Sequence, residues 1–271
     1  MMLGIILGGW FFKENMFNLL IFLVFLSILT AILTTKMITE TLILNTRLGK
    51  NNMNSKNVFK SYKAIIGDYR FILFTLGGIM LMSIEFQRDN YIAVRLTQDF
   101  SPISLVSNNI SLSIDGFRML SILTVVNMLF IILFTSVVSK YVNQFREKKM
   151  YIGFLLFTIG YAVCSISNNL IILLTATVIL SIGELLYVPI RQSILSEIID
   201  ENKRGAYMAL NSLVIQFGKF VASSCLLVSP YLNKFMMGSI VLIFGLLSIL
   251  FTLIAIRKKW RDIRHRNLNA M

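Results

Sequence analysis

Acidic residues inside otherwise apolar stretches are the part of this sequence best suited to chemistry. Glu184 follows a glycine in GELLYVP and lies within an apolar run at residues 170–189. An ionised carboxylate surrounded by a low-dielectric medium is strongly disfavoured, so this side chain is expected to be protonated or paired. A carboxylate that exchanges protons with a cavity is what proton-coupled transport needs, and Glu184 is the leading candidate for that role.

A second group of ionisable residues follows another apolar run, at 71–84. Glu85, Arg88 and Asp89 are spaced i, i+3 and i+4, which places all three on one face of a helix. One cation between two acids leaves a net negative charge there, which suits proton binding or cation attraction. The alternative is an interfacial ion cluster where the helix leaves the membrane.

Other polar residues in apolar runs are candidate partners for these acids. Lys219 lies near the middle of the run 206–228, and a structural Glu184–Lys219 ion pair is the alternative to a transport role for either residue. Arg88 is the other candidate charge partner. Asn127 and Gln216 are candidate polar residues lining a cavity.

Composition argues against enzymatic and metal-binding chemistry. The chain has one histidine and two cysteines, too few for His-based metal sites or a disulfide framework. The single histidine, in the basic tail, also argues against a Ser-His-Asp triad, and GxSxG and GxxxxGK[ST] are absent. We therefore expect no catalytic residues, no metal and no cofactor, and the protein is not expected to be an enzyme.

The elements that must position these side chains are helices long enough to cross a membrane. Of the 271 residues, 56% are hydrophobic and 14% charged, whereas a soluble domain has about a quarter charged residues. A transmembrane helix needs about 20 mostly apolar residues. Seven runs are read as spans: 16–35, 71–96, 119–139, 150–166, 170–189, 206–228 and 235–256. The predicted fold class is an all-α integral membrane protein with seven transmembrane helices.

The charge distribution predicts how these spans are oriented. Four alternate segments hold 20 of the 26 Lys and Arg residues: 36–70, 140–149, 191–204 and the tail from 257. The positive-inside rule places them in the cytoplasm of a multi-pass plasma-membrane protein, with the N-terminus outside. The net charge of +13 is therefore a topology signal and does not indicate nucleic acid. Membrane lipid is the expected surrounding.

The distribution of charged residues gives two further expectations, one for the charge-free runs and one for the basic segment 36–70. The first, fourth and seventh runs contain no charged residue, so they are expected to face lipid while the others line an interior. The segment 36–70 is expected to be a solvated basic linker, with a site for anionic lipid or a partner as the alternative.

Four stretches of this sequence form a recognisable series: LGIILGGWFF at 3–12, QRDNYIAVRL at 87–96, GELLYVPIRQ at 183–192 and ENKRGAYMALNS at 201–212. Together they resemble the C-terminal part of a major facilitator superfamily transporter of the drug:proton antiporter branch. They are similar, in order, to the end of the glycine-rich fifth-span motif, the acidic outer end of the seventh span, the tenth-span segment with its embedded glutamate, and the RG-containing loop before the eleventh span.

The resemblance implies that the seven runs correspond to spans six to twelve of that family. It implies efflux of lipophilic, often cationic small molecules driven by a proton gradient, with Asp89 and Glu184 as the matching acidic positions. Lys219 has no counterpart, and Arg88 and Arg95 depart from the branch pattern. The implied divisions are a fifth-span-like stub with the sixth-span-like helix at 1–35, a cytoplasmic linker at 36–70, the six-helix bundle at 71–257 and a basic cytoplasmic tail at 258–271.

The family's substrate cavity lies between two six-helix halves, so this chain is expected to be an incomplete transporter, either a fragment or the partner of an N-terminal half. A seven-helix receptor or retinal protein is disfavoured, because the run 235–256 lacks the lysine that a retinal Schiff base needs. A non-transporting membrane scaffold or assembly protein, in which the embedded charges are merely paired, stays open as the alternative.

Overall fold

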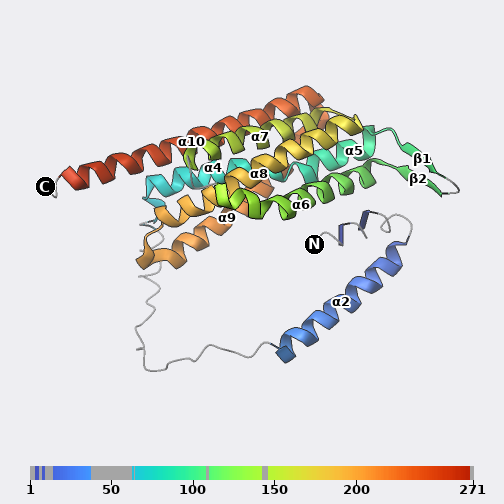
Figure 1. Ribbon diagram of the computed structural model, residues 1–271, viewed down its shortest axis with the longest axis horizontal. Helices are drawn as coiled ribbons and strands as arrows, with labels where there is room; N and C mark the ends of the chain where they lie inside the picture. The colour runs from blue at the N-terminus through green and yellow to red at the C-terminus, as the bar shows by residue number, and fades with distance from the viewer. Residues whose placement is uncertain are drawn as a thin grey trace. The chain divides into compact units, whose positions relative to one another are not determined.

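In a computed structural model of the chain, residues 4–5, 8–9, 15–37, 63, 65–107, 110–141 and 146–268 are described. The chain divides into two compact units, 1–59 and 60–271. Most of the predicted linker 36–70 lies outside the described residues. The first unit contains helix α2, Met16–Met37 (Figure 1). Its 22 residues span about 33 Å, enough to cross the hydrocarbon core of a bilayer.

In its described residues the second unit contains ten larger elements and two short 3-10 helices, Glu201–Lys203 and Ser229–Tyr231. Within the described residues, seven helical segments in the two units are long and apolar enough to span a membrane, which confirms the predicted all-α membrane fold. The second unit's larger elements are α4 (Tyr69–Glu85), the π-helical turn η1 (Arg88–Ile92), α5 (Ala93–Asp99), β1 (Ile103–Ser107), β2 (Ile110–Ile114), α6 (Gly116–Tyr141), α7 (Arg146–Ile166), α8 (Leu170–Ile198), α9 (Arg204–Val228) and α10 (Lys234–Leu268).

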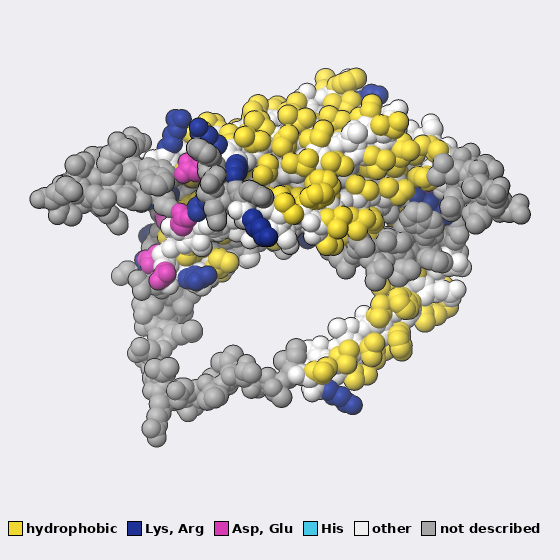
Figure 2. Space-filling view, in the orientation of Figure 1, with side chains coloured by type: hydrophobic (Ala, Val, Ile, Leu, Met, Phe, Trp, Pro, Cys, Tyr) yellow, Lys and Arg dark blue, Asp and Glu magenta, His cyan; other side chains and the backbone are white. Residues whose placement is uncertain are grey.

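A small β-hairpin between α5 and α6 is the feature that sequence reasoning did not anticipate. Strands β1 and β2 pair in antiparallel register, with Ile103 opposite Ile114. The hairpin marks one end of the bundle, here called the hairpin end (Figure 1). Figure 2 shows hydrophobic side chains covering the visible face of the bundle, with most charged side chains gathered near its opposite end.

The bundle is organised around close contact between α7 and α8, with α10 packed on both α4 and α7 and α6 packed on α8. A Cβ placed on Gly183 would lie 2.5 Å from the Phe157 amide nitrogen, and one on Gly153 would lie 2.8 Å from the Gly183 carbonyl oxygen. Only glycine permits the two backbones to approach this closely. As a result, a larger fraction of residues is buried in α7 than in any other candidate span of the described residues. Helix α7 contains the charge-free run 150–166, so the expectation that this run faces lipid is not met.

The helix boundaries lie within a few residues of the predicted runs except at the end of α10, which continues to Leu268 beyond the predicted end at 256, and at Pro189. The sequence predicts that the apolar run ends at Pro189, but α8 continues to Ile198 with the proline inside it. At its start, the Asn169 side chain accepts hydrogen bonds from the backbone N–H groups of Ile171 and Ile172, at 2.9 and 3.3 Å. This N-cap satisfies two of the otherwise unpaired donors of the first turn.

Candidate functional site

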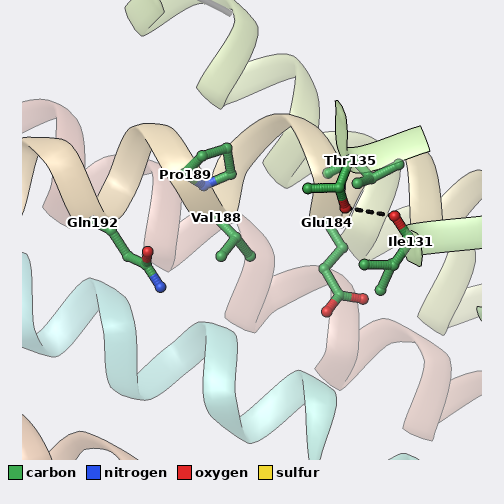
Figure 3. Close-up of a pocket in the computed structure, with 7 residues that line it drawn as sticks. Ile131, Thr135, Glu184, Val188, Pro189 and Gln192 are labelled. Carbon is green, nitrogen blue, oxygen red and sulfur yellow. Dashed lines mark hydrogen bonds between the residues drawn. The ribbon is translucent and has the colours of Figure 1, made fainter. Parts of the chain in front are cut away.

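Glu184 lies midway along α8, at the edge of a cavity between α8 and α6. The cavity has a volume of about 300 Å³ and is lined by Ile131, Thr135, Glu184, Leu185, Val188, Pro189 and Gln192. Figure 3 shows Glu184, Val188 and Gln192 projecting from the same side of α8, as expected for positions i, i+4 and i+8. The Thr135 hydroxyl is used within α6, where it donates to the Ile131 carbonyl. The cavity is therefore largely apolar, with the Glu184 carboxylate as its ionisable group.

Pro189 gives a local reason for a cavity at this point of α8. Proline has no N–H, so the carbonyl of Leu185, four residues earlier, loses its hydrogen bond within the helix. Both residues line the cavity. The interrupted turn of α8 and the carboxylate of Glu184 therefore face the same space.

Asn127 of α6 holds the Glu184 carboxylate in place. Its Nδ2 donates to Glu184 Oε2 at 3.1 Å and to Ser181 Oγ at 2.9 Å. The Ser181 hydroxyl in turn donates to the Thr177 carbonyl at 2.7 Å. Asn127 is 5% exposed and Ser181 is fully buried, so this network is shielded from the surroundings and ties α6 to α8 at the site.

The second predicted group lies where α4 ends and η1 begins. The Ile92 N–H donates to the Gln87 carbonyl, five residues earlier, at 2.9 Å, which is the π-helical pattern often found at functional sites. Arg88 Nε lies 3.6 Å from Asp89 Oδ1, with the two side chains 18% and 63% exposed. Because the wider turn breaks the α-helical register, Asp89 lies at the surface while Glu85 stays half-buried.

Glu85 and Glu184 interact electrostatically although they belong to different helices. They lie within electrostatic range of each other, and both lie within range of the Arg88 guanidinium. Like charges that are close together in a poorly solvated site repel strongly unless a proton or a cation is shared between them. The cluster of Glu85, Arg88 and Glu184 can therefore take up and release a proton, or exchange it for a cation.

The structure does not bring Lys219 or Gln216 into this cluster. Both side chains are exposed on α9, and the Lys219 ammonium lies 5.3 Å from the centroid of the Phe86 ring. In the described part of the chain no ion pair joins Lys219 to Glu184, so the structural pair considered from the sequence is not formed. Nor do those residues contain a group of three or more His, Cys, Asp or Glu that could hold a metal ion.

Arg95 serves the fold and lies apart from the site. Its side chain is 4% exposed and donates to the carbonyls of Cys164, Ser167 and Ile166 at 2.7, 2.7 and 3.3 Å, and to the Asn168 side chain. These acceptors lie at the C-terminal end of α7, where a helix leaves its last carbonyls unpaired and favours a cation. Arg95 thus caps the C-terminal end of α7 and links α5 to the turn between α7 and α8.

Sequence reasoning missed polar residues beside the cluster. Ser181 was detectable, because Thr177, Ser181 and Glu184 are spaced i, i+4 and i+7 in an otherwise apolar run. Tyr161 and Tyr187 are each 2% exposed and are indistinguishable from core residues in the sequence, where each stands in an apolar run.

Arg191 was missed because it follows Pro189 and was counted with a polar loop. In the structure it lies inside α8, with its guanidinium carbon 4.7 Å from the centroid of the Phe74 ring and its Nη2 donating to the Phe74 carbonyl at 3.3 Å. A Cβ on Gly78 would lie 2.0 Å from this Nη2. Glycine at that position is what leaves room for the guanidinium.

A second, larger cavity lies between α4 and α9, with a volume of about 410 Å³. Its lining is apolar apart from Thr75 and includes no ionisable side chain. Of these two cavities, the one at Glu184 is therefore the one with an ionisable side chain in its lining.

Comparisons with known proteins identify relatives of this chain. The profile of the Major Facilitator Superfamily matches residues 91–269. The chain is 28% identical over 165 residues to a protein of Planococcus maritimus described as a Na(+), Li(+), K(+)/H(+) antiporter, an alignment that covers 60% of this chain and 39% of that one. The chain thus spans about two fifths of the length of this curated relative.

Two solved structures have a similar fold. A crystal structure of a POT family transporter in complex with 5-aminolevulinic acid matches with a TM-score of 0.54 and 19% identity, over 91% of this chain and 53% of that one. A POT family transporter in complex with a thioalcohol-conjugated peptide matches with a TM-score of 0.54 and 20% identity, over 93% and 54% of the two chains. At these identities the likeness concerns the fold.

Proposed function

The chain belongs to the Major Facilitator Superfamily, whose members are transporters, and we propose that it is the C-terminal part of a proton-coupled exporter of lipophilic, drug-like small molecules. The observation that carries the proposal is the position of Glu184. Its carboxylate lies at the edge of a largely apolar cavity of about 300 Å³, which is within the size range of small-molecule sites. Glu85 and Arg88 complete the group that exchanges the proton.

In this proposal the proton and a cationic substrate compete for the same carboxylates. When Glu85 and Glu184 are ionised, their charge attracts a substrate cation, and the apolar lining of the cavity accepts its lipophilic body. Protonation removes that attraction, so the substrate leaves. Because Arg88 Nε also lies 3.6 Å from Asp89 Oδ1, its single charge is shared among three carboxylates and does not neutralise both Glu85 and Glu184. Asp89 is assigned to the outer approach to this site.

The name of the Planococcus maritimus relative suggests a second candidate, the exchange of alkali cations for protons. A bare alkali or alkaline-earth cation is held by several oxygen ligands. At the cavity the side-chain oxygens come from Glu184, Gln192 and Thr135, and the Thr135 hydroxyl already donates to a carbonyl. Even with the Leu185 carbonyl that Pro189 leaves unpaired, this set of oxygens is sparse, and the apolar walls favour an organic substrate.

The proposal includes a complementary half and an orientation. The chain corresponds to 53% and 54% of the two POT family chains, and alternating access in secondary transporters takes place between structural repeats. We infer that the chain works with an N-terminal six-helix half in the plasma membrane. Its hairpin end faces outside and its C-terminus is cytoplasmic, as the distribution of Lys and Arg favours.

Everted membrane vesicles from cells that produce this chain together with an N-terminal half of the same family test the proposal. A proton gradient is formed, and ethidium, a lipophilic cation, is added in one arm while Na⁺ or K⁺ is added in the other. Dissipation of the gradient by ethidium is the expected result. Dissipation by Na⁺ or K⁺ alone would instead establish alkali-cation exchange. No response in either arm would favour the non-transporting scaffold.

A further inference from the structure

Tyr187 carries a buried hydroxyl group that the fold does not satisfy. The residue is 2% exposed, and its hydroxyl oxygen has no hydrogen-bond partner among the residues that the structure describes. A buried polar group without a partner destabilises a protein, and such groups in native structures call for an explanation. A phenylalanine would fill the same space without this cost, so packing alone does not account for a tyrosine here.

The ring of Tyr187 is held firmly in its position. Its centroid lies 5.2 Å from that of Phe154 and 5.1 Å from that of Phe157, both on α7. Gly153 lets α7 approach closely, since a Cβ there would lie 3.0 Å from both the Tyr187 nitrogen and its Cβ. The two rings and the adjacent backbone therefore fix the direction of the hydroxyl.

Charged groups of the candidate site lie within electrostatic range of this hydroxyl. Tyr187 lies three residues after Glu184, on the neighbouring turn of α8. It interacts electrostatically with Glu85 of α4, Glu184 and Arg191 of α8, and Tyr161 of α7. A hydroxyl donor without a partner in the described residues thus lies within electrostatic range of two carboxylates.

We propose that Tyr187 is a positioning residue for the carboxylate pair: its hydroxyl donates a hydrogen bond to Glu85 or Glu184 when these residues are ionised. A hydrogen bond to an ionised acceptor is about twice as strong as one between neutral groups. The hydroxyl therefore favours the state that has released its proton. This inference rests on the proposed function, because it requires the two acids to change protonation state during the working cycle.

A purely structural role for Tyr187 makes a different prediction about stability. If the hydroxyl never finds a partner, Tyr187→Phe removes an unsatisfied group and raises the Tm at every pH. If the hydroxyl binds an ionised carboxylate, Tyr187→Phe is stabilising when the acids are protonated and destabilising when they are ionised. The sign of the Tm change at two pH values separates the two roles.

The experiment compares thermal unfolding of the full chain and its Tyr187→Phe variant in detergent micelles. We expect the variant to unfold about 2–4 °C above wild type near pH 5 and about 2–4 °C below it near pH 9. Tyr151→Phe is the matched control. Tyr151 belongs to the same group of rings, 6.2 Å from Phe154, but its hydroxyl interacts with Glu147 and Arg257. Its Tm change is expected to keep one sign.

A second comparison assigns the reversal to the carboxylates. In a chain carrying both Glu85→Gln and Glu184→Gln, Tyr187→Phe is expected to be stabilising at both pH values. A reversal that persists in this background would overturn the proposal, as would a single sign in the wild-type background. The assay involves no transport, so a chain that shows the reversal but moves no substrate would refute the exporter and leave the role of Tyr187 intact.

Discussion

Arg95 allows the stability of the hairpin end to be predicted from hydrogen-bond geometry. Arg95→Met keeps an unbranched side chain but removes every donor. Two lost bonds are short, at 2.7 Å to the carbonyls of Cys164 and Ser167, and a hydrogen bond from a charged donor contributes about 1.5–3 kcal/mol. The expected loss is about 3–6 kcal/mol, which corresponds to a Tm lower by about 6–24 °C.

A thiol-reactive maleimide dye can follow this unfolding in purified chain, because Cys164 is 3% exposed and reacts when α7 opens. A Cys225→Ala background restricts the signal to Cys164. Lys219→Met is the matched control, since it also removes one cation, but from an exposed position with a single ring contact. If the Tm of Arg95→Met lies within about 1 °C of the Tm of Lys219→Met, the assignment of Arg95 as the cap of α7 is refuted.

Three further variants test other parts of the account. Gly183→Val is expected to lower the Tm by overpacking worth about 1–3 kcal/mol or more, since a Cβ there meets the Phe157 nitrogen at 2.5 Å; an unchanged Tm would contradict the close helix contact. Asn127→Leu is expected to leave the fold intact and to change the pH profile of transport. The variant loses the hydrogen bond to the Glu184 carboxylate, worth about 1.5–3 kcal/mol. A pH profile identical to that of wild type would contradict this role of Asn127. Arg146→Ala is expected to lower the free energy of unfolding by no more than about 1 kcal/mol. Its Nη2 lies 2.5 Å from Glu197 Oε1, but the two side chains are 31% and 38% exposed, so solvent weakens the ion pair. A larger loss in thermal unfolding would contradict this expectation.

The seven spans could be predicted because crossing a bilayer requires an apolar run of sufficient length, and such runs can be recognised in the sequence alone. The run 206–228 corresponds to α9 at Arg204–Val228, and 150–166 to α7 at Arg146–Ile166. Pro189 misled the prediction, because a proline inside a membrane helix is tolerated where neighbouring groups compensate for the lost bond. The π-helical turn at Arg88–Ile92 has no comparable sequence signal.

The candidate site could be predicted only in part. Glu184 stands out because an ionisable residue in an apolar run is costly and rare. Its contact with Asn127 joins residues 57 positions apart and depends on how α6 packs against α8, which a run of apolar residues does not specify. The same limit explains why Lys219 was considered as its partner, and why Tyr187 passed for a core residue.

The most direct measurement of the central claim is substrate-driven proton movement in vesicles containing this chain and an N-terminal half, with Glu184→Gln compared with wild type. The variant is expected to lose proton movement while retaining exchange of labelled substrate across the membrane, because the amide keeps the size of the side chain but cannot carry the proton. Lys219→Gln, the same kind of change at an exposed position, is expected to behave as wild type. Proton movement at the wild-type rate in Glu184→Gln would contradict the account.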